Sequence, residues 1–263
     1  MRLEALFRDR GRPLLMPYAT GGYPDLGGCR RIVSTYLEAG ADIVELGIPF
    51  SDPLADGPVI QASSQAALAQ GVRPRDVFAL AGDMTREGAN LVFLSYLNTV
   101  LALGPERFFA ACAEAGVVGV VVPDLPVEEA DEVRTAAAGS DVDLVFLAAP
   151  TSPDERLERI AQAASGFIYC VSVVGVTGVR NQLGEGLPEF LARLRSRTSL
   201  PLAVGFGVST PEQAGVVAAI ADGVIIGSRL VRLVQEAPDL DAGLEEIDAY
   251  LRAVREAMES ASR

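Results

Sequence analysis

The stretch ELGIPFSDPLADGP, residues 45–58, lies where an apolar strand gives way to a loop. The strand itself, Asp42–Leu46, carries the consecutive apolar residues Ile43 and Val44 directly before Glu45 rather than an alternating pattern, as expected of a parallel strand buried on both faces. The loop contains three prolines and two further acids, Asp52 and Asp56, and an amphipathic segment follows it. A strand, a loop and a helix in this order predict a parallel α/β fold.

Seven more β-branched runs recur along the chain, again with amphipathic segments between them. They are Leu14–Met16, Asn90–Ser95, Val117–Val122, Asp143–Ala148, Gly166–Val171, Leu202–Gly205 and Gly223–Ile226. Eight strand–helix units in 263 residues, with no linker or low-complexity break, predict one (β/α)₈ TIM barrel over residues 1–263, preceded by an extra N-terminal helix. A doubly wound open sheet is the alternative, but no GxGxxG motif follows the first strand.

Several helices carry their own start signals. In TSPDE we expect Ser152 as N-cap, Pro153 as the first helical residue and Glu155 closing a capping box, and in STPEQ we expect Ser209, Pro211 and Glu212 in those roles. The last helix has a single apolar stripe that predicts packing against the barrel wall. The stripe is formed by Leu240, Leu244, Ile247, Leu251, Val254 and Met258.

Composition excludes several classes of partner and compartment. The 22 basic and 35 acidic residues give a net charge of −13, which repels nucleic acid and anionic lipid. No stretch approaches the roughly 18 apolar residues of a membrane span, and the charged start does not resemble a secretory signal. Three widely spaced cysteines match neither a disulfide framework nor a zinc site, so we expect a cytoplasmic protein.

Two residue types are missing, and their absence limits the chemistry. All 22 basic residues are arginine, so the chain has no lysine for a Schiff base, and it has no histidine. A histidine general base, a histidine-containing triad and a histidine-ligated metal are therefore excluded. An enzyme with this composition must rely on aspartate and glutamate.

The barrel prediction places three acids at the catalytic face, which lies at the carboxyl ends of the strands. Glu45 ends the second strand, and Asp52 and Asp56 lie on the loop after it. Glu45 could instead form an ion pair with an arginine in the barrel mouth, and Asp56 could simply form a turn in ADGP. The three acids together at the catalytic face, two of them on a proline-rich loop, favour a functional role.

Glycine-rich turns end the last two predicted strands. They are AVGFGVS, residues 203–209, and VIIGSRL, residues 224–230, where Gly227 and Ser228 open a helix. Backbone N–H groups and a helix N-terminus bind anions, and these loops are the usual phosphate position in such barrels. A third glycine loop, VVGVTGV at 173–179, could complete the site or act as a lid. We therefore expect a phosphorylated small molecule as substrate.

The stretch at 45–58 resembles the signature of the tryptophan synthase alpha subunit family. The resemblance continues in order through MPYATGGYPD, SYLNTV, VVVPDLPVEE, FIYCVSVVGVTGVR, AVGFGVST and IIGSRLV. It implies a (β/α)₈ barrel that cleaves indole-3-glycerol phosphate to indole and glyceraldehyde 3-phosphate. It also implies no metal or cofactor in this chain, and a pyridoxal-phosphate beta subunit that receives the indole in an α₂β₂ heterotetramer.

The chemistry of the residues agrees with that reaction. Protonation of indole C3 gives an indoleninium that accepts the electrons of the breaking C–C bond, so the substrate supplies its own electron sink. The protein must supply one acid–base group and one negative charge. The resemblance assigns these roles to Glu45 and Asp56. A glutamate at an apolar barrel mouth should have a raised pKa, whereas Asp56 on a loop should ionise more easily.

The resemblance also implies roles for residues outside the acid pair. The phosphate ligands would be Gly178, Gly207, Gly227 and Ser228, and the indole pocket would be lined by Tyr18, Ile60, Leu94, Tyr169 and Phe206. Thr177 would close the loop after strand six. The residues that face the beta subunit would be Asp52, Asn98 and Pro126. For the apolar members, ordinary core packing is the alternative. Two departures stand out: Tyr18 replaces a common phenylalanine, and Val173 and Val174 replace polar residues of some members.

Two other functions fit the same sequence. One is a non-catalytic barrel kept as an allosteric partner of a beta subunit, and the other is a stand-alone lyase that releases free indole. The retained Glu45 and Asp56 disfavour the first.

Overall fold

The structure, a computed structural model, describes residues 3–172, 186–205 and 207–261. Eight parallel strands form a closed barrel in chain order, with β8 paired to β1. They are β1 (Leu14–Thr20), β2 (Val44–Gly47), β3 (Leu91–Leu94), β4 (Gly119–Val121), β5 (Asp143–Ala148), β6 (Ile168–Val171), β7 (Leu202–Gly205) and β8 (Gly223–Ile226). The closed barrel confirms the predicted (β/α)₈ fold and shows that the open sheet is wrong.

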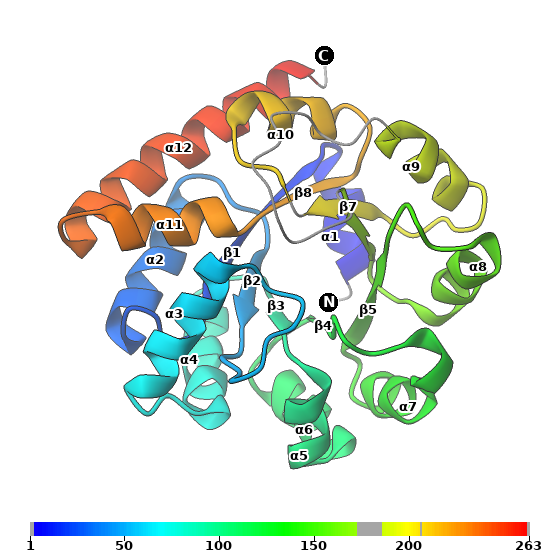
Figure 1. Cartoon of the computed structure of the whole chain (residues 1–263), viewed down its shortest axis with the longest axis horizontal. Helices are drawn as coiled ribbons and strands as arrows, with labels where there is room; N and C mark the ends of the chain where they lie inside the picture. Colours follow the sequence, from blue (N-terminus) through cyan, green and yellow to red (C-terminus); the bar gives the residue numbers. More distant parts are fainter. Residues whose placement is uncertain (1–2, 173–185, 206, 262–263) are drawn as a thin grey trace.

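Helices surround the strands, and α12 runs along the outside of α10 and α11 (Figure 1). They are α1 (Leu3–Arg10), α2 (Leu26–Glu38), α3 (Pro58–Ala69), α4 (Pro74–Arg86), α5 (Leu97–Leu103), α6 (Pro105–Glu114), the 3₁₀ turn η1 (Val127–Glu129), α7 (Asp131–Gly139), α8 (Asp154–Ala163), α9 (Leu187–Arg195), α10 (Pro211–Ala218), α11 (Ser228–Glu236) and α12 (Leu240–Ala261). The extra N-terminal helix is present as α1, and the backbone N–H of its buried Leu3 donates to Asp143 Oδ2 at 2.9 Å.

Strand bounds agree with the prediction for β5, β7 and β8 and differ at the ends of the others. The largest difference is in β1, which was expected to stop at Met16 and continues to Thr20. Pro17 stays in the strand opposite Ile226 of β8, because the fixed φ of proline is compatible with extended backbone. The extension carries Tyr18 to the barrel mouth, where it pairs with Glu45.

The apolar core has two layers, as barrel geometry requires. One layer fills the interior of the barrel and includes Met16, Tyr18, Val92, Val145 and Ile225. The larger layer lies between the strands and the surrounding helices. Strands β1, β3 and β8 are buried on both faces along their whole length, which explains their continuous apolar sequences.

The last helix buries the predicted apolar stripe. In α12, Ile247, Leu251, Val254 and Met258 are buried, and the remaining two leucines of the stripe are partly buried against the same core. The helix contacts α10, α2 and α11. The stripe therefore packs on neighbouring helices of the outer ring.

Both predicted N-caps are wrong by one residue. α8 begins at Asp154, with Pro153 as its N-cap, and Ser152 Oγ instead accepts a hydrogen bond from Ala149 N at 3.3 Å. α10 begins at Pro211, as expected. Its N-cap is Thr210 rather than Ser209, and the capping box is closed by Gln213 rather than Glu212. A proline at the first helical position makes the residue directly before it the N-cap, which selects Thr210.

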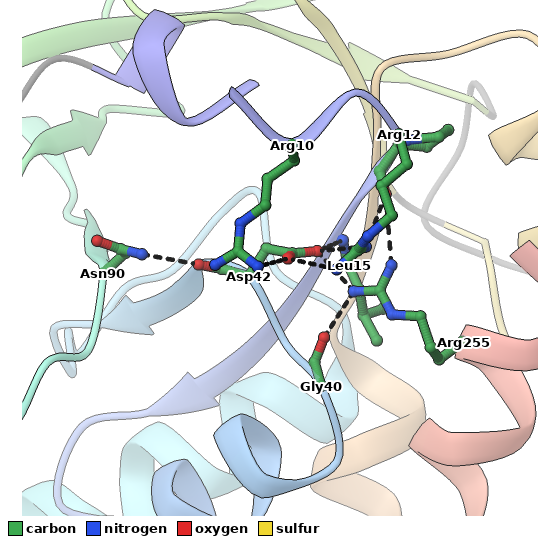
Figure 2. Close-up of polar contacts among 8 residues, drawn as sticks. Arg10, Arg12, Leu15, Gly40, Asp42, Asn90 and Arg255 are labelled. Atoms are coloured by element: carbon green, nitrogen blue, oxygen red, sulfur yellow. Dashed lines mark hydrogen bonds and ion pairs between the residues drawn. The ribbon is translucent and has the colours of Figure 1, made fainter. Parts of the chain in front are cut away.

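A buried carboxylate organises the amino-terminal end of the barrel (Figure 2). Asp42 is 4 % exposed and accepts two hydrogen bonds from Arg12, at 2.9 and 3.1 Å. Arg255 of α12 donates to the same carboxylate at 2.5 Å, and Leu15 N donates at 2.9 Å. Arg10 lies 3.6 Å away and is half exposed. Asp42 thus joins β1, β2 and the C-terminal helix through charge-assisted hydrogen bonds.

In the part of the chain that the structure describes, no helix has the length and apolarity needed to cross a membrane. Cys29, Cys112 and Cys170 are free and buried. Burial raises the pKa of the Cys29 thiol to about 11, so this thiol stays protonated at neutral pH.

Candidate active site

Glu45 lies on β2 at the barrel mouth and is only 3 % exposed. Its Oε1 atom has no hydrogen-bond partner, and no arginine forms an ion pair with it, among the described residues. Burial, and then the negative charge of Asp56, raises the pKa of Glu45 to about 8. The raised pKa agrees with the expectation from sequence, and Glu45 therefore holds a proton at neutral pH.

Asp56 lies on the loop between β2 and α3 and is 7 % exposed. Its backbone N–H donates to Pro53 O at 3.0 Å, so it does form a turn, and its carboxyl group nevertheless stays within electrostatic reach of Glu45. Burial raises the pKa of Asp56 to about 6, and a hydrogen bond with Tyr96 opposes that rise. At neutral pH the site therefore holds one protonated and one ionised carboxyl group.

Tyr96 is a residue of the site that sequence reasoning missed. It directly follows Ser95 after β3, and its hydroxyl accepts a hydrogen bond from Ala55 N at 3.1 Å. The Phe50 ring stacks on the Tyr96 ring at 5.2 Å between centroids. Tyr96 therefore holds the loop that carries Asp56 and stabilises the ionised carboxylate. Tyr96 belongs to the motif SYLNTV, in which the sequence predicted a role only for Asn98. No spacing in the sequence indicates that Tyr96 contacts Asp56.

Two tyrosines of the expected indole pocket cover glycines on the next strand. A Cβ added at Gly47 would overlap the Tyr18 hydroxyl, and one added at Gly205 would overlap the Tyr169 hydroxyl. Burial and then the charges of the acid pair raise the pKa of Tyr169 far above its usual value. Both rings therefore lie across the mouth, with their hydroxyl groups in the places that side chains at 47 and 205 would occupy.

The phosphate and pocket candidates meet beside β1 and β8. A Cβ added at Gly227 would lie 3.5 Å from Tyr18 Cβ and 3.6 Å from Ile60 Cδ1. Leu94 is buried at the end of β3, one strand beyond Glu45. The structure thus brings Tyr18, Ile60 and Gly227 together, while Phe206 lies outside the described residues.

The helix α11 begins at the expected anion position. Gly227 is its N-cap, Ser228 is its exposed first residue, and no side chain caps this helix start among the described residues. The first N–H groups of a helix have no partner within it, so the start of α11 after β8 is suited to an anion. Gly207, after β7, has a φ of +89°, a conformation that favours glycine. Gly178 and Thr177 lie outside the described residues.

The residues expected to face a partner lie in the connections that follow β2, β3 and β4, with Asn98 in the first turn of α5. Asp52 and Asn98 are exposed, and Pro126 is half-buried just before η1. Two exposed leucines accompany them: Leu54 is 87 % exposed on the β2 loop and Leu101 is 52 % exposed on α5. Contact of this surface with another chain stays a prediction.

The pKa of Glu45 predicts how stability depends on pH. The folded chain keeps a proton on Glu45 up to about pH 8, whereas the unfolded chain loses it near its ordinary pKa of 4.5. The folded state therefore binds more protons between these values, and the free energy of unfolding should fall as pH rises from 5 to 8. Glu45→Gln should stabilise the protein more at pH 8 than at pH 5, as measured by urea unfolding. An equal change at both pH values would contradict the raised pKa.

The described residues contain no cluster of three or more His, Cys, Asp or Glu side chains that could hold a metal ion.

Residues 5–262 match the family model described as tryptophan synthase alpha chain. The chain belongs to this family. A tryptophan synthase alpha chain of Carboxydothermus hydrogenoformans is 48 % identical over 87 % of this chain and 86 % of its own length. That of Gloeobacter violaceus is 45 % identical over 98 % and 94 %.

Solved structures agree with the tryptophan synthase alpha chain family. The chain resembles a tryptophan synthase structure of Mycobacterium tuberculosis with a TM-score of 0.89 and 36 % identity, over 98 % of both chains. It resembles the alpha subunit of Legionella pneumophila with a TM-score of 0.87 and 34 % identity, over 98 % and 97 %. Membership in the tryptophan synthase alpha chain family makes this protein a lyase of tryptophan biosynthesis.

Proposed function

We propose that this protein cleaves indole-3-glycerol phosphate to indole and glyceraldehyde 3-phosphate by a retro-aldol reaction. The observation that carries the proposal is the acid pair at the barrel mouth, in which the pKa of Glu45 is about 8 and that of Asp56 is about 6. One group can give a proton near neutral pH while the other keeps its negative charge. That division is what the cleavage requires.

In the proposed reaction Glu45 first donates its proton to indole C3, which gives an indoleninium. Asp56 stabilises the cationic ring at its N–H group. The Glu45 carboxylate then takes the proton of the glycerol hydroxyl next to the scissile bond, and the C–C bond breaks. The electron pair of the broken C–C bond restores the indole ring, and the glycerol carbon that carried the hydroxyl group becomes the aldehyde carbon. The net change moves one proton from oxygen to carbon and returns Glu45 to its protonated form.

The phosphate of the substrate would be bound by Gly207, Gly227 and Ser228, together with Gly178. The free N–H groups at the start of α11 support this placement. Arg229, the next residue, carries positive charge and lies over the ring of Tyr250 at 5.7 Å. That contact directs the Arg229 guanidinium to α12, so the backbone N–H groups at the start of α11, rather than this side chain, are the proposed phosphate ligands.

We infer that the chain needs no cofactor of its own, because the indole ring supplies the electron sink. The absence of lysine supports this view, since a pyridoxal-phosphate imine cannot form here. We further propose a cytoplasmic α₂β₂ heterotetramer in which a pyridoxal-phosphate beta subunit receives the indole. A Pyrococcus furiosus neighbour, with a TM-score of 0.85 and 34 % identity over 93 % and 98 %, is a tryptophan synthase complex. Asp52, Asn98 and Pro126 are the residues proposed to face that subunit.

The deciding experiment measures indole release from indole-3-glycerol phosphate by the purified protein, alone and with beta subunit added. We expect slow turnover alone and a clear increase with the partner. High activity alone, unchanged by the partner, would support the stand-alone lyase. Absence of turnover under both conditions would contradict the proposed reaction and support the non-catalytic partner.

A further inference from the structure

A chain of buried hydroxyl groups leads from the barrel mouth into α3. The Tyr18 hydroxyl lies 3.3 Å from Thr20 Oγ1, which lies 2.7 Å from Ser63 Oγ. Ser63 Oγ donates to the backbone carbonyl of Ile60 at 2.8 Å. The three residues, Tyr18, Thr20 and Ser63, are at most 3 % exposed and are called the hydroxyl chain below.

The carbonyl at the end of the hydroxyl chain fixes its direction. A carbonyl oxygen can only accept, and each hydroxyl group has one proton to donate. The Ser63 proton is used on Ile60 O, so Thr20 must donate to Ser63, and Tyr18 must donate to Thr20. The Tyr18 hydroxyl proton is therefore donated to Thr20 and cannot be donated to a ligand. The Tyr18 hydroxyl oxygen can only accept a hydrogen bond from another group in the site.

That acceptor lies among the groups assigned to catalysis. Tyr18 is the register partner of Glu45 and covers Gly47 at the end of β2. Burial, and then the charge of Asp56, raises the pKa of Tyr18 well above its usual value, so the hydroxyl group keeps its proton. Among the described residues, only Thr20 forms a hydrogen bond with this hydroxyl. No described N–H or O–H group donates to its oxygen.

We propose that the Tyr18 hydroxyl oxygen accepts a hydrogen bond from a glycerol hydroxyl group of the bound substrate, since the ring N–H is assigned to Asp56. Tyr18 then selects a ligand with a donor at this point, and Ser63 is a positioning residue that fixes the direction of the hydroxyl chain. The inference rests on the proposed function and deepens it. A site that accepts a hydrogen bond discriminates against a ligand without the donor, because the buried oxygen is then left unpaired.

Three variants test the proposal with steady-state kinetics on indole-3-glycerol phosphate in the presence of beta subunit. Tyr18→Phe should raise KM about 3- to 10-fold with little change in kcat, because it removes a hydrogen bond made equally before and during the reaction. Ser63→Ala frees the Thr20 proton to occupy the Tyr18 oxygen, so KM should rise again, by a smaller factor. Ser64→Ala is the matched control on the adjacent buried serine, which forms no part of the hydroxyl chain, and its KM should not change.

Binding of indole-3-propanol phosphate, measured by calorimetry, tests which group is the donor. This probe keeps the ring N–H and lacks the glycerol hydroxyl groups. Because a glycerol hydroxyl group is the proposed donor, Tyr18→Phe should leave probe binding unchanged while KM rises. Probe binding that weakens by the same factor as KM rises would overturn the proposal.

An unchanged KM in Tyr18→Phe would overturn the proposal. So would equal losses of kcat and thermal stability in Tyr18→Phe and Ser63→Ala without a change in KM, since that pattern indicates only a structural role. Failure of the proposed function is distinguishable, because it would appear as absence of turnover and of probe binding in the wild-type protein.

Discussion

Glu45→Gln is expected to lower the rate of indole release by about 10²–10⁴-fold, the usual contribution of a positioned acid–base group. The amide has nearly the shape of the carboxylic acid and cannot deliver the proton to indole C3. Because Glu45 is buried and protonated near neutral pH, the substitution also leaves the charge of the site almost unchanged. Substrate affinity, measured in single-turnover or binding experiments, should therefore stay close to that of the wild-type protein.

The matched control is Glu129→Gln, which makes the same change at an exposed position in η1 and should retain full activity. A pH profile gives a second reading. The wild-type rate should fall above about pH 8, where Glu45 loses its proton, and below about pH 6, where Asp56 gains one. The two groups interact, so these limits belong to the pair. Near-wild-type turnover by Glu45→Gln would exclude the proposed mechanism.

Asp42→Ala should lower the free energy of unfolding by about 3–5 kcal/mol, because removing one member of a buried ion pair leaves the other charge without a partner. The substitution strands Arg12 and the largely buried Arg255, and it removes the acceptor of Leu15 N (Figure 2). Urea unfolding monitored by circular dichroism measures the change. Activity at a temperature well below the unfolding transition should be retained, since Asp42 lies at the end of the barrel opposite the site.

Asp154→Ala is a matched control for that effect. Asp154 also pairs with two arginines, Arg193 at 2.7 Å and Arg197 at 3.1 Å, and it is exposed. Exposed ion pairs contribute about 0–1 kcal/mol, so this substitution should be mild. Similar losses in the two variants would show that burial does not set the strength of the Asp42 cluster.

The barrel could be predicted from sequence because its signal is repeated. Each strand is a short apolar run whose length is limited by the turn residues around it. For β5, β7 and β8 the predicted first and last residues are those of the structure. Glu45 was recognisable for a similar reason, since a charge near the carboxyl end of a buried strand has a fixed place in this fold. The start of α10 was misplaced by one residue because Ser209 and Thr210 offer the same capping chemistry, and only the position directly before Pro211 distinguishes them.

Contacts between distant segments could not be predicted. The hydrogen bond between Ala55 N and Tyr96 joins positions 41 residues apart, and Thr20 meets Ser63 across 43 residues. Each of these two hydrogen bonds depends on how segments distant in the sequence are placed relative to one another in the fold. No local sequence pattern predicts that placement. The same limit applies to Asp42, whose residue type indicates a charge but not its three arginine neighbours.

The two tyrosines that cover glycines have a consequence for how this chain can change over evolutionary time. Tyr18 with Gly47, and Tyr169 with Gly205, are each a pair in which one position fills the space of the other. A larger residue at the glycine is tolerated only if the tyrosine becomes smaller first, so each pair should be inherited as a unit. Directed-evolution libraries that randomise the glycine alone would place most new side chains against the tyrosine ring. Libraries that vary both members together could redistribute volume across the barrel mouth and reshape the range of ring systems that it admits.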